Sequence, residues 1–236
     1  MKKLRRSSLS SDAYAFVRAL FLDDDRYRAG GKVSVEALSR ELGVSRTPVW
    51  GAIYRLEAEG IVEIVPRHGV YLINYDPSKA IEIYVTREAL EGMTARRAAA
   101  RITDRQIVAL QTNIEVQREH LSKDEPDKCF AVAFAFHEEI VSIAGSKTLE
   151  RLLQSMFAQI KAMRVQRKYT SMHLSQSCDG YEKVLEALRR RDPDLAEREI
   201  RRQIRGCTEE IRRFLPADSP PAPRARRIML ADRMVR

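Results

Sequence analysis

The chain has 236 residues and a mass of 27.1 kDa, with 44% hydrophobic and 32% charged residues. This balance is typical of one or two soluble globular domains and excludes disorder over most of the length. The longest apolar run, residues 129–136, is much shorter than the roughly 20 residues of a membrane helix. No apolar signal segment follows the basic N-terminus, and three widely separated cysteines do not indicate a disulfide framework. We therefore expect a cytoplasmic protein without a membrane partner.

The net charge of +9 is spread along the chain rather than concentrated in one block. Residues 1–75, 76–215 and 216–236 each carry a net charge of +3. A basic protein is compatible with nucleic-acid binding, but a mixed, solvated surface explains such a distribution equally simply. Charge alone therefore does not decide the function.

The first 75 residues carry the periodicity of three short helices followed by two strands. Apolar side chains three and four residues apart, with serines and glycines at the ends, predict the helices. We expect helices over residues 11–22, from Ser34 to Gly43 and from Ser45 to Gly60. The β-branched runs 61–65 and 70–73 then predict a β-hairpin. The sum is a small winged helix-turn-helix domain over residues 8–75.

From Asp76 onward the sequence shows only helical periodicity. The expected helices cover residues 77–101, about 103–122, 126–144, about 146–169, about 181–191 and 193–214, and the polar residues 173–180 are expected to form a loop. We therefore predict a mainly α fold, with an all-α six-helix domain over residues 76–215. Prolines interrupt the last segment, residues 216–236, which is expected to be a disordered basic tail.

The segment Leu42–Pro48 has the properties that reading a DNA groove requires. A glycine turn is followed by a helix whose first turn carries Ser45, Arg46 and Thr47. The N-terminus of a helix presents free N–H groups and a positive dipole end to phosphate, and an arginine there can reach guanine. The alternative is a helix-turn-helix used only for packing, but a predicted wing follows at a suitable distance.

Several motifs resemble a known family. Residues 44–49 (VSRTPV), 56–62 (LEAEGIV) and 67–72 (RHGVYL) are similar to the DNA-binding domain of GntR-type bacterial transcriptional regulators. Residues 84–91, Phe136-His137 and residues 181–188 resemble the FCD (FadR-type) effector domain. The resemblance covers roughly residues 8–215. It implies a homodimer that binds double-stranded DNA at a palindromic operator. We expect this homodimer to be a repressor that responds to a small-molecule effector.

The resemblance also implies which residues contact DNA. These are Ser45, Arg46 and Thr47, with His68 and Gly69 at the tip of the wing. Arg55 and Arg67 are added as cations that could contact the DNA backbone, and Trp50 completes the candidate set. The chain departs from the family at Glu36 and Trp50, where arginine is usual. A carboxylate at position 36 would repel phosphate unless it accepts from a cytosine amino group. Trp50 is either a base contact or a core residue.

Many FCD domains bind a divalent metal through one Asp and three His residues. The corresponding positions here are Ala133, His137, Tyr181 and Gln203, so one good ligand remains. Zinc requires three or four donors at about 2 Å. We therefore expect no metal cofactor, since the resemblance implies that the ligands are lost at the other three positions. The alternative is a rearranged set with replacement ligands from Glu138, His173 or Cys207.

Four polar residues are expected to converge inside the helical domain. Arg87, His137, Tyr181 and Gln203 offer a guanidinium, an imidazole, a hydroxyl and an amide in apolar surroundings, as small-molecule sites do. Arg87 suits a carboxylate, which predicts an anionic metabolite as the effector. In the simpler alternatives Arg87 pairs with Glu91 and His137 is a satisfied core residue.

The sequence predicts a ligand-responsive repressor rather than an enzyme, because no catalytic motif is found where it could work. Two alternatives stay open. The C-terminal domain could serve dimerisation alone, or the protein could sense redox state through Cys178 or Cys207.

Overall fold

The computed structural model describes residues 6–24, 26–27, 29–74, 77–164 and 171–213. These residues belong to two compact units, one built on residues 1–76 and the other mainly on 77–157 and 168–217. Both units are mainly helical, which confirms the predicted fold class. The tail 216–236 lies outside the described residues. Within the described part of the chain, no helix combines the length and apolarity needed to cross a membrane.

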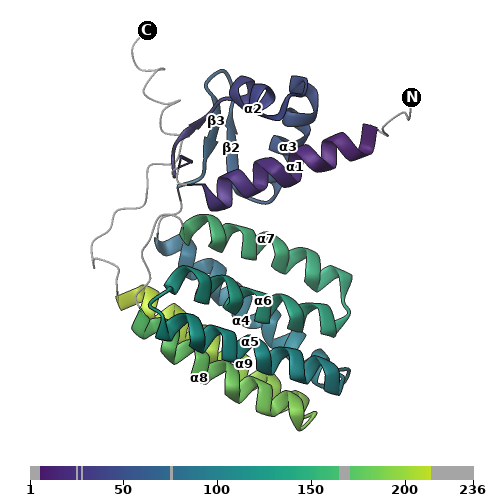
Figure 1. Ribbon diagram of the computed structural model, residues 1–236, viewed down its shortest axis with the longest axis vertical. Coiled ribbons are helices and arrows are strands. Elements are labelled where there is room, and N and C mark those ends of the chain that lie inside the picture. The colour runs from purple at the N-terminus through teal and green to yellow at the C-terminus, as the bar shows by residue number, and fades with distance from the viewer. Residues whose placement is uncertain (1–5, 25, 28, 75–76, 165–170, 214–236) are drawn as a thin grey trace. The chain divides into compact units, whose positions relative to one another are not determined.

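The first unit contains three helices and a small sheet (Figure 1). The helices are α1 (Arg6–Asp23), α2 (Val35–Leu42) and α3 (Arg46–Ala58). Helix α1 begins five residues earlier than expected. The apolar spacing that predicts these helices also builds the core, since Val17, Phe21, Leu38 and Ile53 are buried together with other apolar residues.

The turn between α2 and α3 is fixed by local residues. The Ser34 hydroxyl accepts from the backbone N–H of Ala37 at 3.1 Å, which confirms it as the N-cap of α2. Gly43 ends that helix with φ +64°, a left-handed conformation that glycine adopts without strain. Ser45 is the N-cap of α3 by position, but its hydroxyl makes no capping hydrogen bond. The Ser45 side chain therefore stays available at the exposed helix end.

The sheet has three antiparallel strands in the order β1-β3-β2. The predicted hairpin is confirmed as β2 (Val62–Val65) and β3 (Gly69–Leu72), with Val65 opposite Gly69. Strand β1 (Lys32–Val33) was not predicted, because two residues are too few to show alternation. Its formation depends on β3, where Lys32 pairs with Tyr71 and Val33 with Val70.

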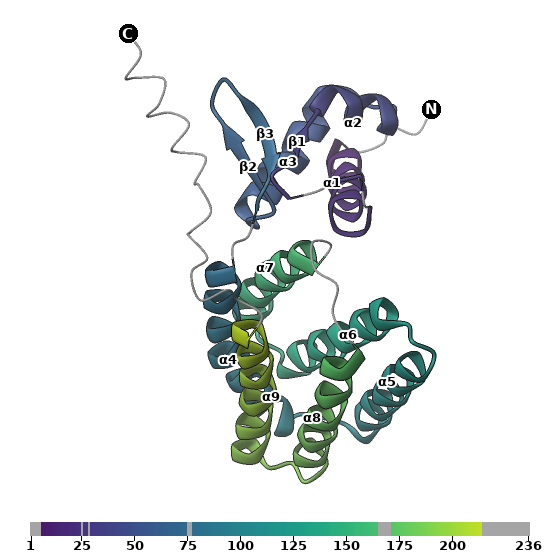
Figure 2. The same cartoon turned by 90° about the vertical axis from the view of Figure 1, so that its left-hand side faces the viewer.

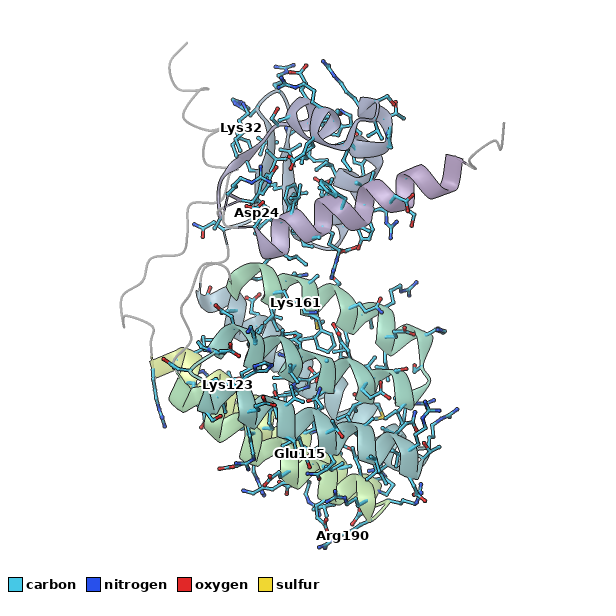
Figure 3. All side chains as sticks on the ribbon, in the orientation of Figure 1. Asp24, Lys32, Glu115, Lys123, Lys161 and Arg190 are labelled. Carbon is cyan, nitrogen blue, oxygen red and sulfur yellow. The ribbon has the colours of Figure 1, made fainter. Side chains whose placement is uncertain are left out.

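The described residues after the sheet form six helices, as expected, and the second unit contains all of them except the part of α7 from Ala158 onward. They are α4 (Pro77–Ala99), α5 (Asp104–Ser122), α6 (Pro126–Ala144), α7 (Lys147–Arg164), α8 (Ser171–Arg189) and α9 (Pro193–Arg213). Helix α4 packs on α9, α9 on α8, α8 on α5, α5 on α6, and α6 back on α4. These five helices therefore form a closed ring, which can be followed in Figure 2. Charged side chains such as Glu115, Lys123 and Arg190 lie on the outside (Figure 3).

Two predicted helix starts are confirmed by their caps. Thr103 and Gln106 form the expected capping box at the start of α5. The carboxylate of Asp192 accepts from the backbone N–H of Leu195 at 3.0 Å at the start of α9. These short-range signals depend on neighbouring residues only, so they could be recognised from sequence.

The loop predicted over residues 173–180 is wrong, because these residues form the first half of α8. The polar composition of this segment suggested a loop, but Cys178, Tyr181 and Leu185 are buried at helical spacing. Packing of this face against α5 and α9 outweighs the weak local propensity. The preceding helix α7 ends at Arg164, and residues 165–170 lie outside the described part of the chain.

Candidate nucleic-acid interface and buried polar cluster

The exposed surface at the start of α3 carries most of the predicted DNA contacts. Ser45, Arg46 and Thr47 are all exposed, and the side chain of Arg46 is 66% accessible. Trp50, one turn further on, is half-buried, and its ring lies 5.7 Å from that of Tyr54. Tyr54 is 59% exposed. The structure therefore extends the candidate surface to Tyr54, which the four-residue spacing from Trp50 could have indicated.

Arg55 does not belong to this surface. Nine positions separate it from Arg46, which places it about 180° around the helix axis. Its guanidinium lies over the ring of Tyr14 on α1, with Cζ 3.6 Å from the ring centroid. Tyr14 also donates to Glu59, and burial together with this hydrogen bond raises the pKa of Tyr14 to about 12. Arg55 thus helps to hold α1 against α3, and its predicted DNA contact is corrected to a packing role.

Glu36 is paired with the first residue of α3. The carboxylate of Glu36, in the first turn of α2, accepts from the guanidinium of Arg46. Both side chains remain exposed, at 61% and 66%. An acid on this surface is therefore accompanied by a compensating cation rather than left alone.

The wing presents its predicted residues in an open turn. Arg67 and His68 are exposed, and Arg67 and Gly69 have φ values of +68° and +119°. The positive φ at position 69 favours glycine, whereas a Cβ there would meet only Lys32, with Cε at 3.0 Å, near the end of a flexible side chain that can move. Lys32 is exposed on β1, beside the wing (Figure 3), and adds a cation that was not expected because β1 was not predicted.

Inside the ring of the second unit, a nearly fully buried ion pair joins two turns of α4. The Nε of Arg87 donates to Glu91 at 2.5 Å, and the two side chains are only 3% and 2% exposed. The guanidinium carbon lies 5.0, 5.6 and 5.1 Å from the ring centroids of Tyr84, Phe134 and Phe157. Among the described residues, the two Nη groups of Arg87 have no hydrogen-bond partner.

The ion pair continues into a chain of hydrogen bonds across three helices. The second oxygen of Glu91 lies 2.5 Å from Nδ1 of His137 on α6, and Nε2 of His137 lies 3.1 Å from the hydroxyl of Tyr181 on α8. Burial raises the pKa of Tyr181 well above its usual value, so the phenol stays protonated and can donate. With a proton on Nδ1, the imidazole can donate to Glu91, and Nε2 can accept from the hydroxyl of Tyr181.

The charge of Glu91 is strongly stabilised. Burial alone would raise the pKa of its carboxyl group. The adjacent Arg87 and His137 lower this pKa by more than burial raises it, so that it falls to about 2. The same carboxylate outweighs burial at Arg87 and raises the pKa of the guanidinium. The interior thus holds a permanent, compensated pair of charges. This is the arrangement that the sequence left open as the alternative for Arg87.

Gln203 on α9 supplies the fourth predicted group. Its side chain is 8% exposed, and its Nε2 donates weakly to Sγ of Cys207 at 3.7 Å. Its Oε1 is buried and has no hydrogen-bond partner in the described structure. A Cβ at Gly180 would meet Cγ of Gln203 at 2.8 Å, so glycine is required for this close approach of α8 and α9.

These side chains do not suit a resident metal ion. Ala133 is buried one turn before His137 and brings no ligand, while Nε2 of His137 is already engaged by the Tyr181 hydroxyl. Among the described residues no group of three or more His, Cys, Asp or Glu side chains is arranged around a common point. Of the replacement ligands considered, Glu138 is exposed and the side chain of His173 lies outside the described set.

The cysteines have the properties of inert thiols. Two causes raise the pKa of the Cys178 thiol: a hydrogen bond with Cys129 on α6, which is the larger, and burial. Burial likewise raises the pKa of Cys207. Because the thiolate is the reactive form, raised pKa values disfavour oxidation.

Comparisons with known proteins agree with this architecture. Residues 9–72 match the family described as bacterial regulatory proteins, gntR family, and residues 82–206 match the FCD domain. The chain is 27% identical to the HTH-type transcriptional repressor RspR of Escherichia coli K12 over 194 residues, covering 80% of this chain and 83% of that protein.

Two further proteins extend this similarity. The chain is 24% identical to the "Probable D-xylose utilization operon transcriptional repressor" of Paenarthrobacter nicotinovorans, covering 92% and 91% of the two chains. The solved structure of E. coli McbR/YncC is similar with a TM-score of 0.75 at 17% identity, covering 87% of this chain and 97% of that one. At this identity the structural likeness concerns the fold alone.

Proposed function

The chain belongs to the gntR family of bacterial regulatory proteins and regulates transcription, and we propose that it is a repressor that binds a palindromic operator as a homodimer. The proposal rests on the exposed N-terminal face of α3, where Ser45, Arg46 and Thr47 meet a helix N-terminus. Hydroxyl groups, free N–H groups and an arginine suit a phosphate backbone and a guanine edge.

A dimer is supported by an apolar stripe on the outer face of α4. Val85, Ala89 and Met93 follow one another at four-residue spacing and are all exposed, Val85 at 49% and Met93 at 43%. Burial of such a stripe against a second copy would remove apolar surface from water. Two copies would then present two recognition helices to successive major grooves.

The effector proposed for the FCD domain is a small anion with a hydrogen-bond donor. Among the described residues the Nη groups of Arg87 and the Oε1 of Gln203 have no hydrogen-bond partner, so the former suit a carboxylate and the latter suits a donor such as a hydroxyl. Binding would change operator affinity only by as much as the effector prefers one conformation of the dimer. No metal is part of this proposal, because the hydroxyl of Tyr181 contacts Nε2 of His137, the nitrogen that would bind a metal.

Selection of bound sequences from random duplex DNA tests the operator half. We expect a palindrome to be enriched at near-physiological salt. Arg46→Ala should weaken binding to it by about 2–6 kcal/mol, since a dimer makes each bidentate guanine contact twice. Arg55→Gln is the matched control on the opposite face of α3 and should retain specific binding. No enrichment, or equal affinity of wild type and Arg46→Ala, would refute this half.

The effector half is tested with matched compounds that differ in charge. D-xylonate carries a carboxylate that D-xylose lacks. One relative is named as a probable transcriptional repressor of a D-xylose utilization operon, so we choose this pair first within a panel of sugars and sugar acids. We expect acids, and not neutral sugars, to raise the melting temperature and weaken operator binding. The charge-neutral variant Arg87→Met/Glu91→Gln keeps an acceptor for His137 and should lose the response. If no acid acts on wild type, the alternative of a purely dimerising domain is favoured.

A further inference from the structure

The ion pair between Glu36 and Arg46 lies on the surface that faces the operator in the proposed function. It joins the first turn of α2 to the first residue of α3, across the glycine turn. The contact uses Oε1 of Glu36 and one Nη group of Arg46. Among the described residues, the second carboxylate oxygen and the remaining N–H groups of Arg46 have no partner.

A carboxylate at this place is unfavourable for contact with the DNA backbone. It repels phosphate, so it weakens every non-specific complex. Its pairing with Arg46 has two effects on a specific complex. First, the guanidinium of Arg46 is held beside the carboxylate and is less free to turn toward a phosphate. Second, the edge of the guanidinium that does not contact Glu36 keeps two N–H donors, which match O6 and N7 of guanine.

We propose that Glu36 is a specificity-determining residue that works with Arg46 as one unit. Arg46 donates to a guanine, and the free oxygen of Glu36 accepts from a cytosine amino group, so that the pair specifies a C·G base pair in each half-site. Adenine in place of guanine, or thymine in place of cytosine, leaves a buried donor or acceptor unpaired. This inference rests on operator binding as proposed above.

Glu36→Gln separates this role from a merely structural one. The side chain keeps its size, but an amide donates as well as accepts, so it admits other bases, and it no longer fixes Arg46 by charge. We expect the preference for the C·G pair to fall by about 5- to 100-fold. Affinity for non-specific DNA should rise, because a repulsive charge has been removed.

Glu41→Gln is the matched control. Glu41 is an exposed acid on the same helix, but it pairs with Arg26 at 3.1 Å and not with α3. The Glu41→Gln variant loses one negative charge, as Glu36→Gln does. Its affinity for non-specific DNA should therefore also rise, while its base preference stays that of wild type.

The experiment is the selection of bound sequences with full-length wild type, Glu36→Gln and Glu41→Gln, followed by affinity measurements on single-base operator variants. A strict C·G position in the wild-type operator that is relaxed only in Glu36→Gln supports the inference. An unchanged preference in Glu36→Gln, or the same loss in Glu41→Gln, overturns it while operator binding stands. If wild type enriches no sequence, operator binding itself has failed.

A second measurement tests whether the two residues act together. Arg46→Lys keeps the charge of residue 46 and loses the planar fork. If the pair is one unit, Glu36→Gln should cost no further base preference in the Arg46→Lys background. Fully additive losses would show that the two residues contact DNA independently.

Discussion

The substitution Glu91→Gln tests the energetics of the buried cluster most directly. It preserves side-chain size but removes the charge that compensates Arg87, which is 3% exposed. The pKa of Glu91 falls from 4.5 to about 2 in the folded protein. At about 1.4 kcal/mol per pKa unit, the ionised carboxylate contributes about 3 kcal/mol to stability. The cost of breaking a buried ion pair, about 3–5 kcal/mol, is of the same size.

The pH dependence has a definite sign. Because the folded-state pKa lies below the unfolded value, this stabilisation is fully present above about pH 4.5 and is lost as the pH falls toward 2. The free energy of unfolding of wild type should therefore exceed that of Glu91→Gln by about 3 kcal/mol at pH 7, and this difference should shrink steadily below pH 4.5.

Urea unfolding followed by circular dichroism at 222 nm is the assay, because the helical bundle dominates that signal. Glu82→Gln is the matched control on the same helix, since Glu82 forms an exposed pair with Lys79 and should change stability by less than about 1 kcal/mol. The double variant Arg87→Met/Glu91→Gln should recover much of the loss, because no uncompensated charge remains.

Two outcomes would refute the reasoning. A loss of less than about 1 kcal/mol for Glu91→Gln at pH 7 would mean that the cation at Arg87 is not desolvated as the structure indicates. A difference that stays constant from pH 7 to pH 3 would mean that the loss comes from packing and not from charge.

Three further predictions concern the same interior. Gln203→Met should raise stability without effector by about 1 kcal/mol, because it removes a buried carbonyl oxygen that has no partner; thermal unfolding measures this, and a loss would argue that the amide is satisfied. A chelator should leave the melting temperature of wild type unchanged. The triple variant Ala133→Asp/Tyr181→His/Gln203→His restores the ligand set of the family, so added Zn²⁺ should raise its melting temperature. Zinc found bound to purified wild type would contradict this prediction. Gly180→Ala should lower stability by about 1–3 kcal/mol, because its Cβ would overlap Gln203; a neutral result would show that α9 shifts freely.

The features predicted correctly from sequence are those set by neighbouring residues. Ser34, Gly43 and Thr103 act on the backbone within a few positions, so their roles are visible in the sequence. Strand β1 depends on pairing with β3, and the first half of α8 depends on packing against other helices. Such long-range support overrides local propensity, and a polar segment gives no sign of it.

The candidate sites show the same division. The resemblance brought Arg87, His137 and Tyr181 to one interior, and the structure joins them in one chain of contacts. The pairing of Arg87 with Glu91 was one of the alternatives that the sequence offered, because the two residues lie one turn apart on one helix. The contact of Glu91 with His137 could not be inferred, because it depends on side-chain orientation across helices. Arg55 is a different case, since its angle around α3 relative to Arg46 was available from the sequence.

The closed ring has a consequence for synthesis in the cell. It is completed by α4 and α9, the first and last helices of the domain, and a salt bridge of 2.5 Å between Glu88 and Arg205 spans 117 residues of chain. Contacts of such sequence separation form late and slow folding. A nascent chain lacking α9 cannot close the ring, whereas α1, α2, α3 and the sheet, all within residues 6–74, have already been synthesised. We therefore expect the ribosome-bound chain to hold a folded helix-turn-helix and wing before the ring of helices has closed.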